Sequence, residues 1–171
     1  MAKINLPKNI ISKEDYLALS ASQKEEYIHN FLKDLLDNNR DGITVSQVDE
    51  ATYLGHSTIW HHLEILASRA QCLRIQHGDT FVYYSNKIIE DLKQLDIQDK
   101  FYRYCFNIVE NTYGKFVRLQ IKQENRSGVP RTNCGVIIHK NRINDIMNKL
   151  AEINERHLND KHEKDSSSNP A

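Results

Sequence analysis

An apolar stripe of helical period dominates the first part of the chain. It follows a capping-box sequence that begins at Ser22, and it consists of Tyr27, Ile28, Phe31, Leu32, Leu35 and Leu36. This pattern predicts a core-facing helix that ends near Asn38, where Asp41-Gly42 stops it. A short helix over residues 12–19 is predicted in front of it.

Two further helices are predicted after that stripe. Residues 44–53 begin with a capping-box pattern, which predicts a short helix, and residues 54–56 supply a tight turn. The next helix is expected to begin at Ser57 or Thr58, because apolar residues recur at helical spacing behind them at Ile59, Leu63, Leu66 and Ala70.

Strict alternation then replaces the helical period. Leu73 and Ile75 alternate with polar residues, residues 77–80 have the composition of a turn, and Phe81 to Ser85 completes a second strand. The order of elements is therefore that of a helix-turn-helix followed by a two-stranded wing, an arrangement that usually binds duplex DNA.

Residues 57–66, Ser-Thr-Ile-Trp-His-His-Leu-Glu-Ile-Leu, resemble the winged-helix domain of the ArsR and MarR transcription regulators. The shared features are a serine or threonine start, a histidine-leucine pair, a second leucine three residues on, a polar wing tip and a strand ending in tyrosine. The resemblance covers residues 20–86. It implies a DNA-binding transcriptional regulator that is a homodimer, with base contacts from Ser57, Thr58, Trp60 and His61 of the recognition helix and wing contacts from Arg74 and His77.

Residues 87–112 carry two stripes that fit helices. The first consists of Ile88, Ile89, Leu92 and Leu95, and the second of Phe101, Tyr104, Cys105, Ile108 and Val109. We expect two helices with a break near residues 96–97. The resemblance implies that they pair with a partner subunit, but packing on their own domain would produce the same stripes.

The last third of the chain is predicted to form a strand, a loop, a strand and a helix. Residues 116–122 alternate, with Val117, Leu119 and Ile121 expected on the buried face and Arg118, Gln120 and Lys122 on the other. A second strand is expected at residues 135–140, followed by a helix capped by Asn141. This unit should pack on residues 87–112 or on a second subunit. It is faintly similar to the single-strand-binding coactivators known as positive cofactor four, which implies binding of unpaired DNA.

The patterns together predict a mainly α protein with a small β wing, in which a winged helix-turn-helix is joined to a C-terminal strand-strand-helix unit. The expected organisation is an N-terminal extension at 1–19, the winged helix-turn-helix domain at 20–86, linking or dimerisation helices at 87–112, the basic unit at 113–158 and a disordered tail at 159–171.

Charge is distributed unevenly although the whole chain, with 23 basic and 23 acidic residues, is neutral. Residues 43–86 hold two basic and four acidic residues, whereas residues 113–150 hold eight basic and two acidic ones. Lys and Arg supply most of the affinity for phosphates. The basic unit is therefore expected to add phosphate contacts or dimer contacts, and its candidate residues are Arg118, Lys122, Arg126, Arg131, Lys140 and Arg142.

Departures from the family pattern support a second interpretation. Trp60 and Glu64 stand where the family usually has polar or basic residues, Asp79 replaces a basic residue at the wing tip, and Gln71 stands where a glycine often ends the recognition helix. The alternative function is a winged-helix protein-protein interaction module, for which the basic unit would suit an acidic protein partner.

Other classes of function find no support in the sequence. No phosphate loop, nucleophile elbow or zinc-protease helix occurs, so we expect neither an enzyme nor a cofactor.

His61 and His62 are adjacent rather than one helical turn apart, which argues against a metal site, and His62 is expected to be a partly buried histidine. Cys72, Cys105 and Cys134 have no paired spacing and are expected to be reduced thiols. Without an apolar run that could cross a membrane or direct secretion, the expected location is cytoplasmic.

Overall fold

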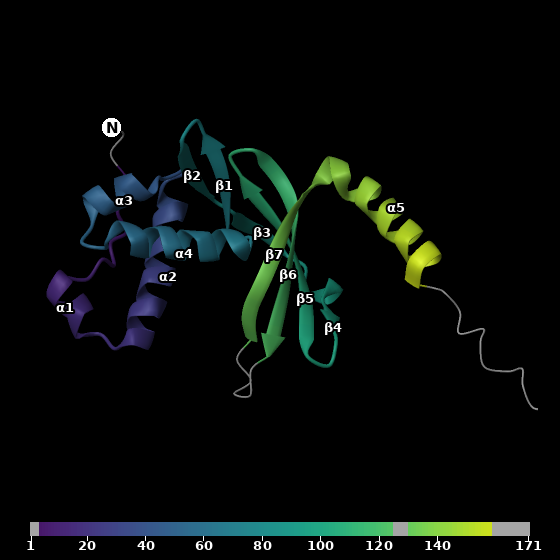
Figure 1. Ribbon diagram of the computed structural model, residues 1–171, viewed down its shortest axis with the longest axis horizontal. Helices are drawn as coiled ribbons and strands as arrows, with labels where there is room; N and C mark the ends of the chain where they lie inside the picture. Colours follow the sequence, from purple (N-terminus) through teal and green to yellow (C-terminus); the bar gives the residue numbers. More distant parts are fainter. Residues whose placement is uncertain (1–3, 125–129, 159–171) are drawn as a thin grey trace, which may run out of the picture. The chain divides into compact units, whose positions relative to one another are not determined.

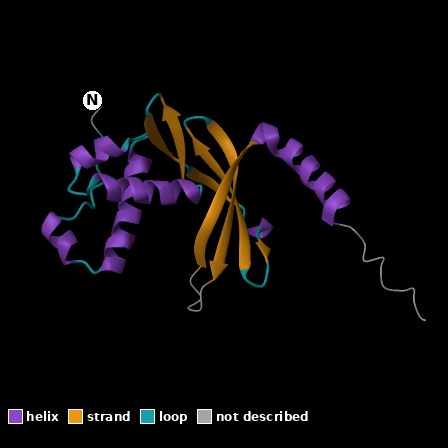
Figure 2. Cartoon of the chain, viewed as in Figure 1, coloured by secondary structure: helices purple, strands orange, loops and turns teal. Residues whose placement is uncertain are grey.

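The computed structural model describes residues 4–124 and 130–158 (Figure 1). The chain divides into two units, residues 1–138 and residues 139–171, which are described separately. The α-helices and strands, shown in Figure 2, are α1 Lys13–Ala18, α2 Ala21–Asn38, α3 Val45–Ala51, α4 His56–Ser68, β1 Cys72–His77, β2 Thr80–Ser85, β3 Lys87–Asp91, β4 Ile97–Gln98, β5 Tyr102–Asn111, β6 Gly114–Glu124, β7 Pro130–His139 and α5 Ile143–Ile153. Shorter helical turns occupy Lys93–Leu95, Lys140–Arg142 and Asn154–Leu158.

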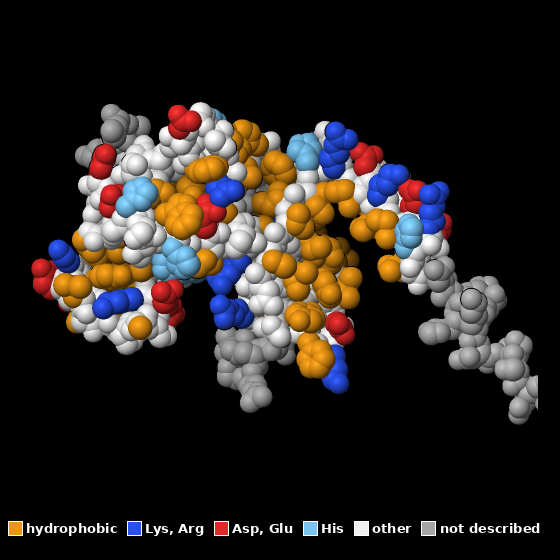
Figure 3. Space-filling model, viewed as in Figure 1, with side chains coloured by type: hydrophobic (Ala, Val, Ile, Leu, Met, Phe, Trp, Pro, Cys, Tyr) orange, Lys and Arg blue, Asp and Glu red, His pale blue; other side chains and the backbone are white. Residues whose placement is uncertain are grey.

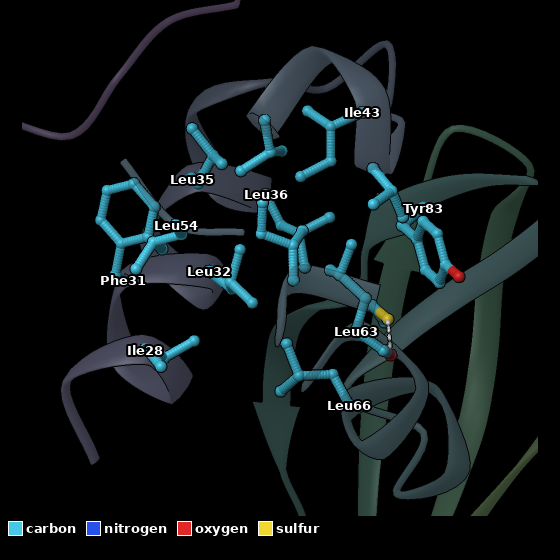
Figure 4. Packing of buried hydrophobic residues seen from close by; sticks show 14 residues of the cluster. Ile28, Phe31, Leu32, Leu35, Leu36, Ile43, Leu54, Leu63, Leu66 and Tyr83 are labelled. Atoms are coloured by element: carbon cyan, nitrogen blue, oxygen red, sulfur yellow. Dashed lines mark hydrogen bonds between the residues drawn. The ribbon is translucent and has the colours of Figure 1, made fainter. Parts of the chain in front are cut away.

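Helices α2, α3 and α4 enclose an apolar core (Figure 4). The stripe predicted on α2 supplies much of it, and the fully buried side chains include Leu32, Leu35, Val48, Ile59, Leu63 and Leu66. Ile4, Ile10 and Tyr16 of the N-terminal extension pack against this core, so the extension folds together with α2, α3 and α4. We call residues 4–86 the helical unit.

The helix boundaries follow local capping. The cap of helix α2 lies two residues before the predicted cap at Ser22, because Ser20 and Gln23 form the capping box. The predicted capping box at Thr44 is confirmed at the start of α3. Helix α4 ends at Ser68, where Ala70 has a φ of 55° and the backbone N–H of Gln71 donates to the Leu66 carbonyl at 2.8 Å. The left-handed turn that ends the helix thus falls on an alanine.

The predicted hairpin of β1 and β2 is confirmed. The two strands pair from Cys72 opposite Ser85 to His77 opposite Thr80, with Gly78 in the turn at a φ of +60°. Tyr83 also exchanges two backbone hydrogen bonds of 2.8 and 2.9 Å with Ile43, which ties the hairpin to the segment between α2 and α3.

The prediction of a mainly α protein is wrong. The described residues are 44% helix and 34% strand, with a five-stranded antiparallel sheet in addition to the hairpin. The two helices expected over residues 87–112 are instead β3, a short helical turn, β4 and β5. Their isoleucine, valine, tyrosine and phenylalanine content favours strands, and pairing between β5 and its neighbours outweighs the helical spacing of the apolar residues.

The sheet has the order β3-β5-β6-β7, with β4 paired to β5. Strand β6 runs antiparallel to β5 from Asn111 opposite Gly114 to Tyr102 opposite Gln123, so it packs on residues 87–112 as one of the two alternatives expected. Strand β7 begins five residues before its predicted start. We call residues 87–138 the sheet.

The predicted faces of β6 are reversed in burial. Arg118 is 5% exposed and Gln120 is 4% exposed, whereas Val117, Leu119 and Ile121 are only half-buried. The reason is that the polar face turns toward the helical unit, where the Gln120 side-chain amide donates to the Arg69 carbonyl at 2.6 Å.

The second unit contains α5, which is the helix predicted after the second strand. The expected cap at Asn141 is wrong, because α5 begins after Arg142 and has no side-chain cap. The backbone N–H of Asn141 instead donates to His139 Nδ1 at 3.2 Å. The predicted disordered tail at 159–171 lies outside the described residues.

Candidate nucleic-acid interface

The first two turns of α4 present one face to solvent. Ser57, Trp60 and His61 are exposed and Thr58 is half-buried, and Trp60 keeps 50% of its surface accessible. The opposite face carries Ile59, Leu63 and Leu66, which are all fully buried. Helical geometry therefore brings the four predicted recognition residues to the outer side of the helix. Figure 3 shows apolar side chains beside histidines on the visible face of the helical unit.

Glu64 lies one turn after Trp60 and is held by two donors. Arg74 Nη1 lies 2.5 Å from Glu64 Oε2, and the Tyr83 hydroxyl donates to Glu64 Oε1 at 2.6 Å. Burial raises the pKa of Glu64, but these two hydrogen bonds outweigh it and bring the pKa below its ordinary value. Arg74 also lies over the Phe81 ring, 4.6 Å from its centroid. The guanidinium predicted to contact DNA from the wing therefore already has partners within the protein.

The other predicted wing residue is also engaged. His77 Nε2 lies 3.1 Å from the Tyr84 hydroxyl, and the two rings are in contact. His77 remains exposed at the end of β1. Both wing candidates are thus on the surface. A contact of either residue with DNA would have to coexist with its hydrogen bond inside the protein.

His62 is the buried histidine that the sequence predicted. It is 3% exposed, and its Nε2 lies 3.6 Å from Glu25 Oε2. Burial lowers its pKa, with Glu25 opposing this shift. Within residues 4–124 and 130–158, no group of three or more His, Cys, Asp or Glu side chains could hold a metal ion. Cys72 and Cys105 are buried and Cys134 is exposed, all as free thiols.

The six basic candidates are placed very differently. Arg118 is buried and donates twice to Asn107 Oδ1, at 2.8 and 3.3 Å, so its prediction as a surface phosphate contact is wrong. Lys122 is half-buried and Arg131 is exposed. Lys140 and Arg142 are exposed in the second unit, where Arg142 forms an ion pair with Asp145 at 3.0 Å. Arg126 lies outside the described residues.

Sequence reasoning missed the proximity of Arg69 to Arg131. Burial, and then the positive charge of Arg131, lower the pKa of Arg69, so the two guanidinium groups lie within electrostatic reach. Gly135 lets β7 pack closely on the backbone of Arg69, because a Cβ at position 135 would lie 2.5 Å from the Arg69 carbonyl oxygen. Figure 3 shows Lys and Arg side chains where the helical unit meets the sheet. No sequence pattern links positions so far apart, so only the fold reveals this pair.

Comparison of the chain with models of protein families, with curated protein sequences and with solved structures gives no match. Among the described residues, no helix is both long enough and apolar enough to cross a membrane.

Proposed function

We propose that the chain is a cytoplasmic DNA-binding transcriptional regulator that reads duplex DNA with the first two turns of α4. The observation that carries this proposal is the division of α4 into a fully buried apolar face and an exposed face with Ser57, Trp60 and His61. Serine and threonine hydroxyls bond to several base edges, and an apolar ring suits a thymine methyl group.

Phosphate contacts must come from outside α4. Helix α4 contains neither lysine nor arginine, and Arg74 is paired with Glu64. The positive charge of Arg131 lowers the pKa of Arg69, so the two groups interact electrostatically, and Lys122 adds a third positive charge on the sheet. We propose that these three side chains supply the electrostatic part of the affinity.

A homodimer belongs to the same proposal. Helix α5 carries an amphipathic stripe of Ile146, Met147, Leu150 and Ile153, which is of the kind that pairs helices between subunits. Light scattering of the full chain at micromolar concentration measures its mass directly, and a monomeric mass would contradict this part of the proposal.

The second candidate function is a protein-protein interaction module. It is favoured by the exposed Trp60 on α4 and by the exposed Phe81 ring that Arg74 covers, because tryptophan and arginine dominate the energetic centres of protein interfaces. An acidic protein partner would suit the basic residues of the sheet.

Fluorescence anisotropy with random duplex and single-stranded DNA of equal length, over a range of salt, separates the two functions. We expect duplex binding whose log affinity falls linearly with log salt, with a slope of about −0.9 per phosphate contacted. Trp60→Ala with His61→Ala should weaken duplex binding with little change in slope, whereas Lys122→Glu with Arg131→Glu should reduce the slope.

Lys13→Glu is the matched control, since it changes an exposed lysine of α1 and should leave binding unchanged apart from the small effect of net charge. Absence of binding to either DNA at low salt would contradict the proposal and favour the interaction module. Stronger binding of single strands, insensitive to changes at Trp60, would instead assign the binding to the sheet.

A further inference from the structure

A cavity of about 450 Å³ lies between the helical unit and the sheet. Its lining comes from α2, from the segment that joins β2 to β3, and from β6 and β7. A cavity of this size falls within the range of about 300–1,000 Å³ that small ligands occupy in proteins. Of its lining residues, Lys122 alone belongs also to the proposed DNA interface.

The cavity is strongly cationic. Lys33, Lys87, Arg118 and Lys122 line it, and Asp37 is the one carboxylate among its described lining residues. Asp37 accepts a hydrogen bond from Ser85. Within the described part of the chain, no carboxylate lies at ion-pair distance from any of the four cationic side chains.

Arg118 is the fixed member of this group. It is 5% exposed, and Asn107 holds it with two hydrogen bonds. Asn107 in turn donates to Asp91 at 2.7 Å, so a carboxylate compensates the guanidinium only through an amide. A positive charge buried without a direct anionic partner is costly, and a bound anion would compensate it.

Gln71 gives a second, independent indication of a ligand. It lines the same cavity, and its buried Oε1 has no hydrogen-bond partner among the described residues. A buried acceptor without a partner costs free energy, which a hydroxyl group donating to it would recover. The cavity therefore offers cationic groups for an anion together with an acceptor for a hydroxyl.

We infer that this cavity binds a small hydroxyl-bearing phosphate ester, such as a sugar phosphate or a nucleoside phosphate. Lysine and arginine side chains are the usual donors to phosphate oxygens. The ligand would contact α2 of the helical unit as well as β3 and β6 of the sheet. The inference does not depend on DNA binding by α4.

Calorimetry and thermal unfolding of the full chain with ADP and with ribose 5-phosphate, at ionic strength matched with NaCl, test the inference. We expect at least one of the two compounds to bind at a single site and to raise the Tm, because a ligand that binds only the folded state stabilises it.

Lys87→Gln with Lys122→Gln should weaken binding about tenfold or more, since two charged contacts are removed. The matched control, Lys93→Gln with Lys115→Gln, removes two exposed lysines that do not line the cavity and should change affinity less than about twofold.

Gln71→Leu sharpens the test, because it should weaken binding without lowering the Tm of the unliganded protein. The inference is overturned if neither compound raises the Tm beyond the NaCl reference, or if the two lysine pairs affect binding equally. It is also overturned if the Lys87 and Lys122 changes weaken only single-stranded DNA binding, which would make the cavity a nucleic-acid site. Loss of DNA binding in Trp60→Ala with ADP binding retained would separate this site from the proposed function.

Discussion

The helical unit and the sheet bury different kinds of side chain. In the helical unit, fully buried leucines and isoleucines from α2 and α4 meet in one apolar cluster (Figure 4). On the side of the sheet that faces the helices, the buried residues include Asn107, Arg118 and Gln120, and the buried apolar residues of β5 are Cys105 and Val109. The first region is stabilised mainly by apolar packing, whereas the second also needs the hydrogen bonds of its buried polar side chains to be complete.

An amphipathic strand does not always bury its apolar face. Strand β6 turns Arg118 and Gln120 inward because their partners, Asn107 and the Arg69 carbonyl, lie there. Buried polar groups are tolerated when they are hydrogen-bonded. Side chains that satisfy one another across two strands can therefore replace an apolar layer.

The largest effect is expected in the apolar cluster. Leu63→Ala should lower the free energy of unfolding by about 3 kcal/mol, because it leaves a cavity at a fully buried site. Val109→Ala, at an equally buried site in the sheet, should cost about 1.5 kcal/mol for its two methyl-sized groups. Urea unfolding monitored by circular dichroism measures both. Equal losses would contradict the distinction between the two regions.

A somewhat smaller effect is expected from Asn107→Leu in the polar layer. The change leaves the buried Arg118 guanidinium without its acceptor and should cost about 2 kcal/mol. The double variant Asn107→Leu, Arg118→Met should recover much of that loss, since replacing both partners of a buried polar pair by apolar groups is often neutral. A double variant that loses the sum of the two single changes would show that the pair is not coupled.

The helical unit could be predicted from the sequence because its signals are local. The capping box at Thr44, the stripe on α2 and the turn at Gly78 each act within a few residues. Residues 87–112 could not be assigned in the same way. The adjacent pairs Ile88-Ile89 and Ile108-Val109 fit a helical stripe better than strict alternation, and the pairing of β3 with β5 and of β5 with β6 makes these segments strands.

The candidate site was predictable on α4 but not on the sheet. Ser57, Trp60 and His61 follow from the helical period once Ile59 and Leu63 are placed inside. The burial of Arg118 and the pairing of Arg74 with Glu64 depend on side chains brought together by tertiary structure, and no spacing rule reveals them. Counting charges along the chain therefore overestimates the cations that a ligand can reach.

The contact between the two regions is tested by Gly135→Ala. The new Cβ would lie 2.5 Å from the Arg69 carbonyl oxygen and 2.9 Å from the Ala70 Cβ, so β7 or the end of α4 must shift. We expect a loss of about 1–2 kcal/mol. Relative to the unchanged protein, the variant should show a larger increase in hydrogen exchange at the backbone amides of β6 and β7 than at those of α2. Cys134→Ala, at the exposed neighbouring position, is the control and should stay within about 0.5 kcal/mol.

The smallest expected effect is the pH dependence of stability, which comes from buried basic side chains. These side chains also differ between the two regions. Burial lowers the pKa of His62 in the helical unit and the pKa of Arg118 in the sheet, but only the histidine titrates near neutral pH. Because the folded-state pKa of His62 lies below its unfolded value of about 6.5, the unfolded chain takes up the proton first. Stability should therefore fall as the pH drops below about 6.5, until the folded-state pKa is passed.

His62→Gln should flatten this part of the profile, and His29→Gln should flatten it further, because burial also lowers the pKa of His29. Urea unfolding at half-unit steps between pH 5 and pH 8 measures the slope. Arg118→Met is the informative comparison from the sheet: it should lower stability by the same amount at every pH in this range, since a guanidinium keeps its proton throughout. A profile for His62→Gln that runs parallel to that of the unchanged protein would mean that Glu25, whose carboxylate lies 3.6 Å from the imidazole, fully offsets the burial of the ring.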